Sequence, residues 1–158
     1  MVVAFGIPAA DYLINRGDTQ YTSYDANHPT IAAAQAAAQN SLDHFREELE
    51  SAISTDEFTL DVKVFTTRGS DEVVQLESVR FLGADRVSGR IIHKPYNELR
   101  GGMQKGDYVE AVVGAVTDWS YRDGAKFRGN FTTRVLLKLQ DERTQNEVRS
   151  RLHENPLP

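Results

Sequence analysis

Between residue 30 and about residue 53, apolar side chains recur at intervals of three and four positions. The recurring positions are Ile31, Ala34, Ala38, Leu42, Phe45, Leu49 and Ala52. This spacing places them on one face of a helix, and the alanine-rich first half has high helix propensity. Pro29 suits a first helical turn, where its missing N–H costs nothing. The pattern therefore predicts one long helix whose apolar face packs against the rest of the domain.

The apolar period changes to two at Phe58, where apolar and polar residues begin to alternate up to residue 64. Alternation of this kind is typical of a half-buried strand. Further strands are predicted over residues 72–82 and 86–93, separated by polar, glycine-containing turns. The alternation slips near Ser78, which predicts a bulge. These strands are short and closely spaced, which favours an antiparallel meander.

Two more strands are predicted after a long loop. Residues 95–106 lack any periodicity and contain paired glycines, so they form either a functional loop or a simple crossover. A strongly apolar strand is expected over residues 108–116, and a last strand over 127–139. Arg122-Asp123-Gly124 supplies the hairpin turn that leads into that last strand, because Asp-Gly readily adopts positive φ values.

Three regions follow from these elements. Residues 1–26 are predicted to form an N-terminal arm, with a short helix near residues 9–16. Residues 27–140 are predicted to form a single α+β domain. One domain is the number expected for a chain of 158 residues. Residues 141–158 are a charged tail with one short amphipathic helix, ended by prolines.

Charge and composition narrow the classes of function. The net charge of −5 provides no general attraction to nucleic acid or anionic membranes, so no nucleic-acid partner is expected. The absence of cysteine excludes disulfides, thiolate metal sites and cysteine nucleophiles. No apolar run reaches the roughly 20 residues of a membrane span. The N-terminus lacks the basic residues and apolar core of a signal peptide, so a cytoplasmic location is expected, or a periplasmic one if a leader was removed.

The titratable residues do not form a recognisable catalytic or metal-binding motif. The histidines, His28, His44, His93 and His153, fall in different predicted elements without metal-ligand spacing. No nucleophile elbow, P-loop or dinucleotide fingerprint is present. We therefore predict no catalytic residues, no cofactor and no metal, and favour a protein that is not an enzyme. His93 is the histidine nearest to the long loop.

The best candidate site is an aromatic cluster at the hairpin. If residues 127–139 form a strand, either Phe131 or Thr133 lies opposite the aromatic residues Trp119 and Tyr121, and Arg134 lies opposite Asp118. One interpretation is structural: Trp119 fills the core under the long helix and Asp118 pairs with Arg134. The other is functional: the same cluster forms a pocket wall with polar groups at its edge.

Several stretches of the chain carry a family resemblance. They are residues 24–27, 58–63, 72–79, 87–90 and 105–109, with Thr117-Asp118-Trp119 and Gly129-Asn130-Phe131-Thr132-Thr133-Arg134 as the most specific part. Over about residues 24–139 the chain resembles the YegJ-type bacterial domain of unknown function, which usually has a second glycine where Asn130 stands. The resemblance implies an α+β fold in which one N-terminal helix packs on a curled, mainly antiparallel sheet. It implies no known enzyme activity, and some relatives resemble immunity proteins of bacterial toxin systems.

Two functional hypotheses follow. The first is a non-catalytic binding or interaction domain of a bacterial protein, immunity-like in that it neutralises or escorts a partner protein. The binding residues expected are Tyr96 in the loop, His93 beside it, and Asp118, Trp119, Tyr121, Phe131 and Arg134 at the hairpin. The alternative is a small-molecule-binding protein or hydrolase with a pocket around His93, Asp118, Tyr121 and Arg134.

Overall fold

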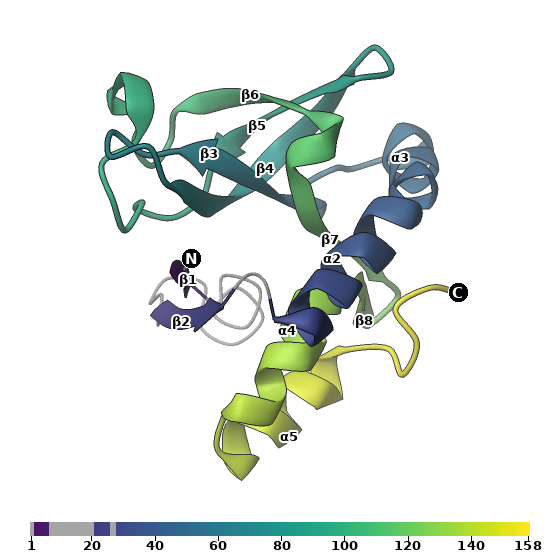
Figure 1. The fold of residues 1–158 in the computed structure, drawn as a ribbon. Helices are drawn as coiled ribbons and strands as arrows, with labels where there is room; N and C mark the ends of the chain where they lie inside the picture. The colour runs from purple at the N-terminus through teal and green to yellow at the C-terminus, as the bar shows by residue number, and fades with distance from the viewer. Residues whose placement is uncertain (1, 7–20, 26–27) are drawn as a thin grey trace.

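The computed structural model describes residues 2–6, 21–25 and 28–158, which form an α+β fold (Figure 1). The strands are β1 (Val2–Gly6), β2 (Tyr21–Asp25), β3 (Thr59–Phe65), β4 (Asp71–Leu82), β5 (Arg86–Ile91), β6 (Tyr108–Val112), β7 (Val116–Asp123) and β8 (Lys126–Gly129). The α-helices are α2 (Pro29–Asn40), α3 (Leu42–Ser51), α4 (Phe131–Leu136) and α5 (Glu142–Arg151). Short 3₁₀ helices are η1 (Arg100–Gly102), η2 (Val113–Ala115) and η3 (Leu137–Leu139).

Strands β3 to β8 form one antiparallel sheet in the order β6-β5-β4-β3-β7-β8. The predicted strands over residues 58–64, 72–82 and 86–93 are confirmed as β3, β4 and β5. The predicted bulge is confirmed as well, because Ser78 has a φ of 51° and the β4–β5 register shifts between Glu77 and Arg80. The expectation of a curled sheet is wrong. The sheet is not strongly curled, and its two edge strands, β6 and β8, remain apart.

The single long N-terminal helix is also corrected, since the chain forms α2 and α3 with a break at Ser41 (Figure 1). The Ser41 hydroxyl donates to the carbonyl oxygen of Ala37 at 2.7 Å. The Trp119 indole N–H donates to the carbonyl oxygen of Ala38 at 3.1 Å. Both carbonyls stand in the last turn of α2, where such side-chain donors compete with the helical hydrogen bonds. The apolar face continues across the break, with Ala38 and Phe45 fully buried.

The predicted last strand over residues 127–139 is wrong beyond Gly129. The chain leaves the sheet at Gly129 and Asn130, whose φ values of 73° and 57° place both in the left-handed region. Glycine and asparagine tolerate this conformation best, which explains why a glycine also fits the position of Asn130. Residues from Phe131 onward then form α4 and η3. The C-terminal helix was predicted correctly and is α5.

Among the described residues, hydrophobic clusters lie on both faces of the sheet. On one face, α2 and α3 pack their apolar stripe on β3, β4 and β7 around Leu60, Phe45 and Trp119. On the other face, Ile31, Val73 and Leu136 form a smaller cluster, beside which buried polar side chains lie. In the predicted N-terminal arm, β1 and β2 pair antiparallel, whereas the helix expected near residues 9–16 lies outside the described residues.

Candidate functional site

The aromatic part of the hairpin cluster lies in the core. Trp119 is 1% exposed, and its ring centroid lies 5.6 Å from that of Phe45 and 5.3 Å from that of Phe131, which it meets edge to face. Tyr121 stacks on Trp119 and its hydroxyl lies 2.8 Å from Nε2 of His44 on α3. Trp119 therefore fills the core under the helices, as the structural interpretation predicted. Phe131 reaches it from a helix rather than from a strand.

Asp118 lies on the opposite face of β7 and caps the start of α4. Its carboxylate accepts hydrogen bonds from the backbone N–H groups of Trp119, Phe131 and Thr132, at 2.8, 3.0 and 2.8 Å. It also accepts one from the Thr132 hydroxyl at 2.6 Å. An acidic side chain that satisfies free N–H groups in the first turn stabilises a helix. This role was missed because residues 131–139 were assigned to a strand.

The expected ion pair between Asp118 and Arg134 does not form. The Arg134 guanidinium donates instead to the backbone carbonyl oxygens of Gly129 and His153, both at 2.8 Å. These bonds connect α4 to β8 and to the segment after α5. Arg134 therefore anchors the C-terminal segment.

A second buried acid, Asp61, lies directly opposite Asp118 in the β3–β7 register. Asp61 is 4% exposed and Asp118 is 2% exposed. Burial raises the pKa of Asp61 well above its usual range; the nearby Asp118 charge raises it further, and a hydrogen bond from Gln75 opposes the shift. Burial raises the pKa of Asp118 too, but its hydrogen bonds offset part of that effect. Asp61 is thus the member of the pair whose pKa is raised more strongly, so it keeps its proton to a higher pH than an ordinary carboxyl group does.

Replacing this proton-retaining acid should change how stability depends on pH. An unfolded Asp ionises near pH 4, whereas folded Asp61 retains its proton at higher pH, so the free energy of unfolding falls as pH rises above about 4 and levels off above the folded pKa. We expect Asp61→Asn to match the wild type near pH 3 and to be more stable at pH 7. Urea unfolding at both pH values measures the difference.

The control for this prediction is Asp56→Asn, which removes an exposed carboxylate three residues before β3 begins. Its free energy of unfolding should follow the wild-type pH dependence. If Asp61→Asn were less stable than the wild type at pH 7 and equally so at pH 3, the assignment of the proton to Asp61 would be wrong.

The four residues of the alternative pocket are not brought together. His93 follows β5, whereas Asp118 and Tyr121 belong to β7, and two strands lie between β5 and β7 in the sheet. Asp118 and Tyr121 also occupy opposite faces of their strand. Burial and the positive charge of Lys105 lower the pKa of His93, and Glu77 opposes the shift. His93 belongs to the surroundings of the long loop rather than to the hairpin.

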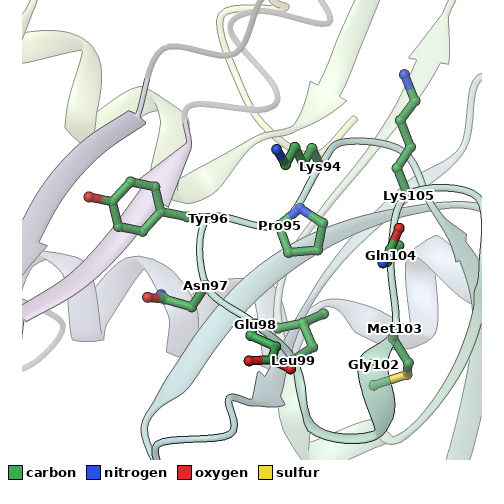
Figure 2. Close-up of a pocket in the computed structure, with 10 residues that line it drawn as sticks. All are labelled: Lys94, Pro95, Tyr96, Asn97, Glu98, Leu99, Gly102, Met103, Gln104 and Lys105. Carbon is green, nitrogen blue, oxygen red and sulfur yellow. The ribbon is translucent and has the colours of Figure 1, made fainter.

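The loop between β5 and β6 encloses a hollow of about 590 Å³. Residues 94–99 and 102–105 line it, so the two limbs of the loop face each other across it. Figure 2 shows Lys94 and Lys105 at one end of the hollow, while Met103 lies near the other and the Tyr96 ring extends away from both. The volume lies within the range of small ligand pockets. Tyr96 is the one predicted site residue in this loop.

The loop is anchored to the sheet by Glu72, a residue that sequence reasoning missed. The Glu72 side chain is buried in β4 and accepts hydrogen bonds from the backbone N–H groups of Tyr96 and Asn97 and from the Asn97 side chain, the last two at 2.8 and 3.0 Å. The Leu99 side chain is 1% exposed and belongs to the main core. The sequence signal was an acidic residue at an inward-facing strand position, which is unfavourable unless a partner satisfies it.

Two exposed aromatic side chains lie where this loop meets the turn between β3 and β4. Tyr96 is 61% exposed and Phe65, at the end of β3, is 56% exposed. The Arg100 guanidinium lies 4.9 Å from the centre of the Phe65 ring, in a cation–π contact. We call Phe65, Tyr96 and the hollow the loop face. It combines aromatic surface with polar groups, which is typical of binding surfaces.

The comparisons with known proteins agree with the resemblance seen in the sequence. Residues 28–152 match the family described as "Uncharacterized protein conserved in bacteria (DUF2314)", so the chain belongs to that family. No curated protein and no solved structure matches the chain significantly. Within the described parts of the chain, no group of His, Asp and Glu side chains is arranged to hold a metal ion, and no helix is long and apolar enough to span a membrane.

Proposed function

We propose that this domain is a non-catalytic binding module that recognises another bacterial protein through the loop face. In its specific form the role is immunity-like, in that the domain neutralises or escorts its partner. The observation that carries the proposal is a long loop, fixed to the sheet by Glu72, that leaves Tyr96 61% exposed.

Anchoring of the loop supports this proposal energetically. A mobile loop loses conformational entropy when a partner orders it, whereas an anchored loop has lost most of that entropy on folding. The hydrogen bonds to the buried Glu72 carboxylate are charge-assisted and therefore strong. A tyrosine with an exposed ring on an anchored backbone is also a typical source of binding energy at protein interfaces. Recognition by such a surface requires no reacting group.

The alternative function, a small-molecule-binding protein or hydrolase, relies on four residues that lie apart. A hydrolase needs a base or nucleophile within hydrogen-bond reach of the reacting group. His93 and Asp118 are separated by two strands, and Asp118 already accepts four hydrogen bonds, three of them from the start of α4. The geometry therefore favours the binding module.

The test is a comparative pull-down from bacterial lysate with the wild type, Tyr96→Ala and Ile53→Ala as bait. Ile53 is fully exposed, follows α3 and does not line the hollow of the loop face. We expect one protein retained in a stoichiometric amount by the wild type and by Ile53→Ala, and reduced tenfold or more by Tyr96→Ala. Because Tyr96 is exposed, its substitution should change the free energy of unfolding by less than about 1 kcal/mol.

The outcome is read from quantitative mass spectrometry of the retained proteins, after circular dichroism has shown that the three baits are equally folded. Equal retention of the partner by Tyr96→Ala and Ile53→Ala would exclude the loop face as the binding surface. Absence of any stoichiometric partner for the wild type would count against the binding module itself.

A further inference from the structure

A second hollow, of about 450 Å³, lies where α4, η3, α5 and the C-terminal segment meet. It is lined by Arg134, Leu137, Arg149, Leu152, His153 and Glu154. Leu137 and Leu152 are almost fully buried. The polar groups available to a bound molecule are therefore those of the two arginines, His153 and Glu154.

The Arg134 guanidinium has one nitrogen whose hydrogen-bonding capacity is unused. Its Nε donates to the Gly129 carbonyl oxygen at 2.8 Å, and its Nη1 donates to the carbonyl oxygens of His153 and Glu154 at 2.8 and 3.3 Å. Its Nη2 is buried and has no hydrogen-bond partner among the described residues. Buried donors in proteins are normally paired, so a buried, unpaired donor in an arginine that lines a hollow leaves part of that guanidinium's charge uncompensated by the described chain.

The charge of Arg134 is also incompletely balanced. The acceptors of its hydrogen bonds are neutral carbonyl groups. Burial lowers the pKa of Arg134; the Asp118 charge opposes that shift, while the positive charge of Arg128 adds to it. The Asp118 carboxylate already accepts hydrogen bonds from the backbone N–H groups in the first turn of α4. An additional negative charge near Arg134 would therefore be stabilised.

We propose that this hollow binds the oxyanion group of a small ligand, a phosphate or a carboxylate. Arg134 supplies one cation from the wall of the hollow, and Arg149 on α5 supplies the second from its exposed rim. Guanidinium groups suit this task because their planar N–H donors match the spacing of oxyanion oxygens. Glu154 lies on the same rim and competes with the anion. The site is separate from the loop face and does not depend on the proposed function.

The experiment measures the melting temperature of the full chain in sodium phosphate, in sodium citrate and in sodium chloride of equal ionic strength. A molecule that binds only the folded state raises the melting temperature. With millimolar affinity and 20 mM phosphate, we expect a rise of about 3 to 7 °C over chloride. A larger rise in phosphate than in citrate identifies a phosphate site, and the reverse identifies a carboxylate site.

Two variants test whether the rise in melting temperature comes from anion binding in this hollow. Arg149→Gln removes the rim cation, whereas Lys138→Gln removes an exposed cation of η3 that does not line the hollow. We expect the anion-dependent rise to be lost in Arg149→Gln and retained in Lys138→Gln. Phosphate should also shift the amide NMR signals of Leu137 and His153 but not those of residues 94–105. An equal rise in all three proteins, or no rise in the wild type, would overturn the proposal.

Discussion

Gly129→Ala should prevent the domain from folding, or cost at least about 4 kcal/mol of its free energy of unfolding. A Cβ atom at Gly129 would overlap the carbonyl oxygen of Trp119 and would lie 2.5 Å from an atom of the indole ring. Neither group can move away, because Trp119 belongs to the sheet and its ring is enclosed by the core. The φ of 73° adds backbone strain for any residue with a side chain.

Gly124→Ala is the matched control for this prediction. Gly124 has nearly the same backbone conformation, with a φ of 66°, but a Cβ atom there would meet nothing within 4 Å. Its substitution should cost only about 1 kcal/mol, the usual strain of alanine at positive φ. Urea unfolding followed by fluorescence of the single tryptophan measures both variants. Equal losses at the two glycines would show that the close approach to Trp119 contributes nothing.

Asp118→Ala should be the second most damaging substitution, with a loss of about 3 to 5 kcal/mol. The change leaves the backbone N–H groups of Phe131 and Thr132 without their acceptor in a buried position. A buried donor left unsatisfied costs about 1 to 3 kcal/mol, because water cannot replace the lost acceptor. The loss of a helix cap adds about 1 kcal/mol. The start of α4 should loosen, and amide hydrogen exchange at residues 131–134 should accelerate.

Asp141→Ala is the matched control, because it removes a helix-capping carboxylate of the same kind at the surface. Asp141 caps α5 and accepts hydrogen bonds from the Thr144 N–H and hydroxyl groups at 2.9 and 2.8 Å, as Asp118 does from Thr132. Asp141 is exposed, so water satisfies the freed donors and the loss of stability should be much smaller. If the two substitutions destabilised the domain equally, burial of the Asp118 cap would not be the source of its effect.

The parts of the fold that the sequence predicted correctly are those with local causes. The alternation of residues 58–64 produces β3, and the alternation that slips at Ser78 produces a bulged β4. The Asp-Gly turn joins β7 to β8 because Gly124 adopts the positive φ that the turn needs. The candidate site was predicted only in part: Tyr96 was assigned to an exposed loop, but the pairing of Asp118 with Arg134 depended on a strand that ends at Gly129.

The break between α2 and α3 shows why the remainder could not be predicted locally. The apolar pattern runs through Ser41 without interruption, so nothing in the periodicity separates two helices. The Ser41 hydroxyl is a local contributor to the interruption. The other contributor is the indole N–H of Trp119, which donates to the carbonyl oxygen of Ala38 although it lies 81 residues further along the chain. A side chain so distant in the sequence has no effect on a pattern read over a few turns.

The sequence by itself determined the α+β class, the strands β3 to β5, the hairpin turn and the C-terminal helix, because period and turn residues act over a few neighbours. The strand predicted over residues 108–116 was correct only as far as Val112, where β6 ends and η2 begins. Only the tertiary structure decided that residues 131–136 form a helix, that Trp119 is core, and that Glu72 fixes the long loop. In each of these cases a buried polar or aromatic group finds its partner in another element. Such partnerships become defined only when the chain has folded and water has been excluded from around them.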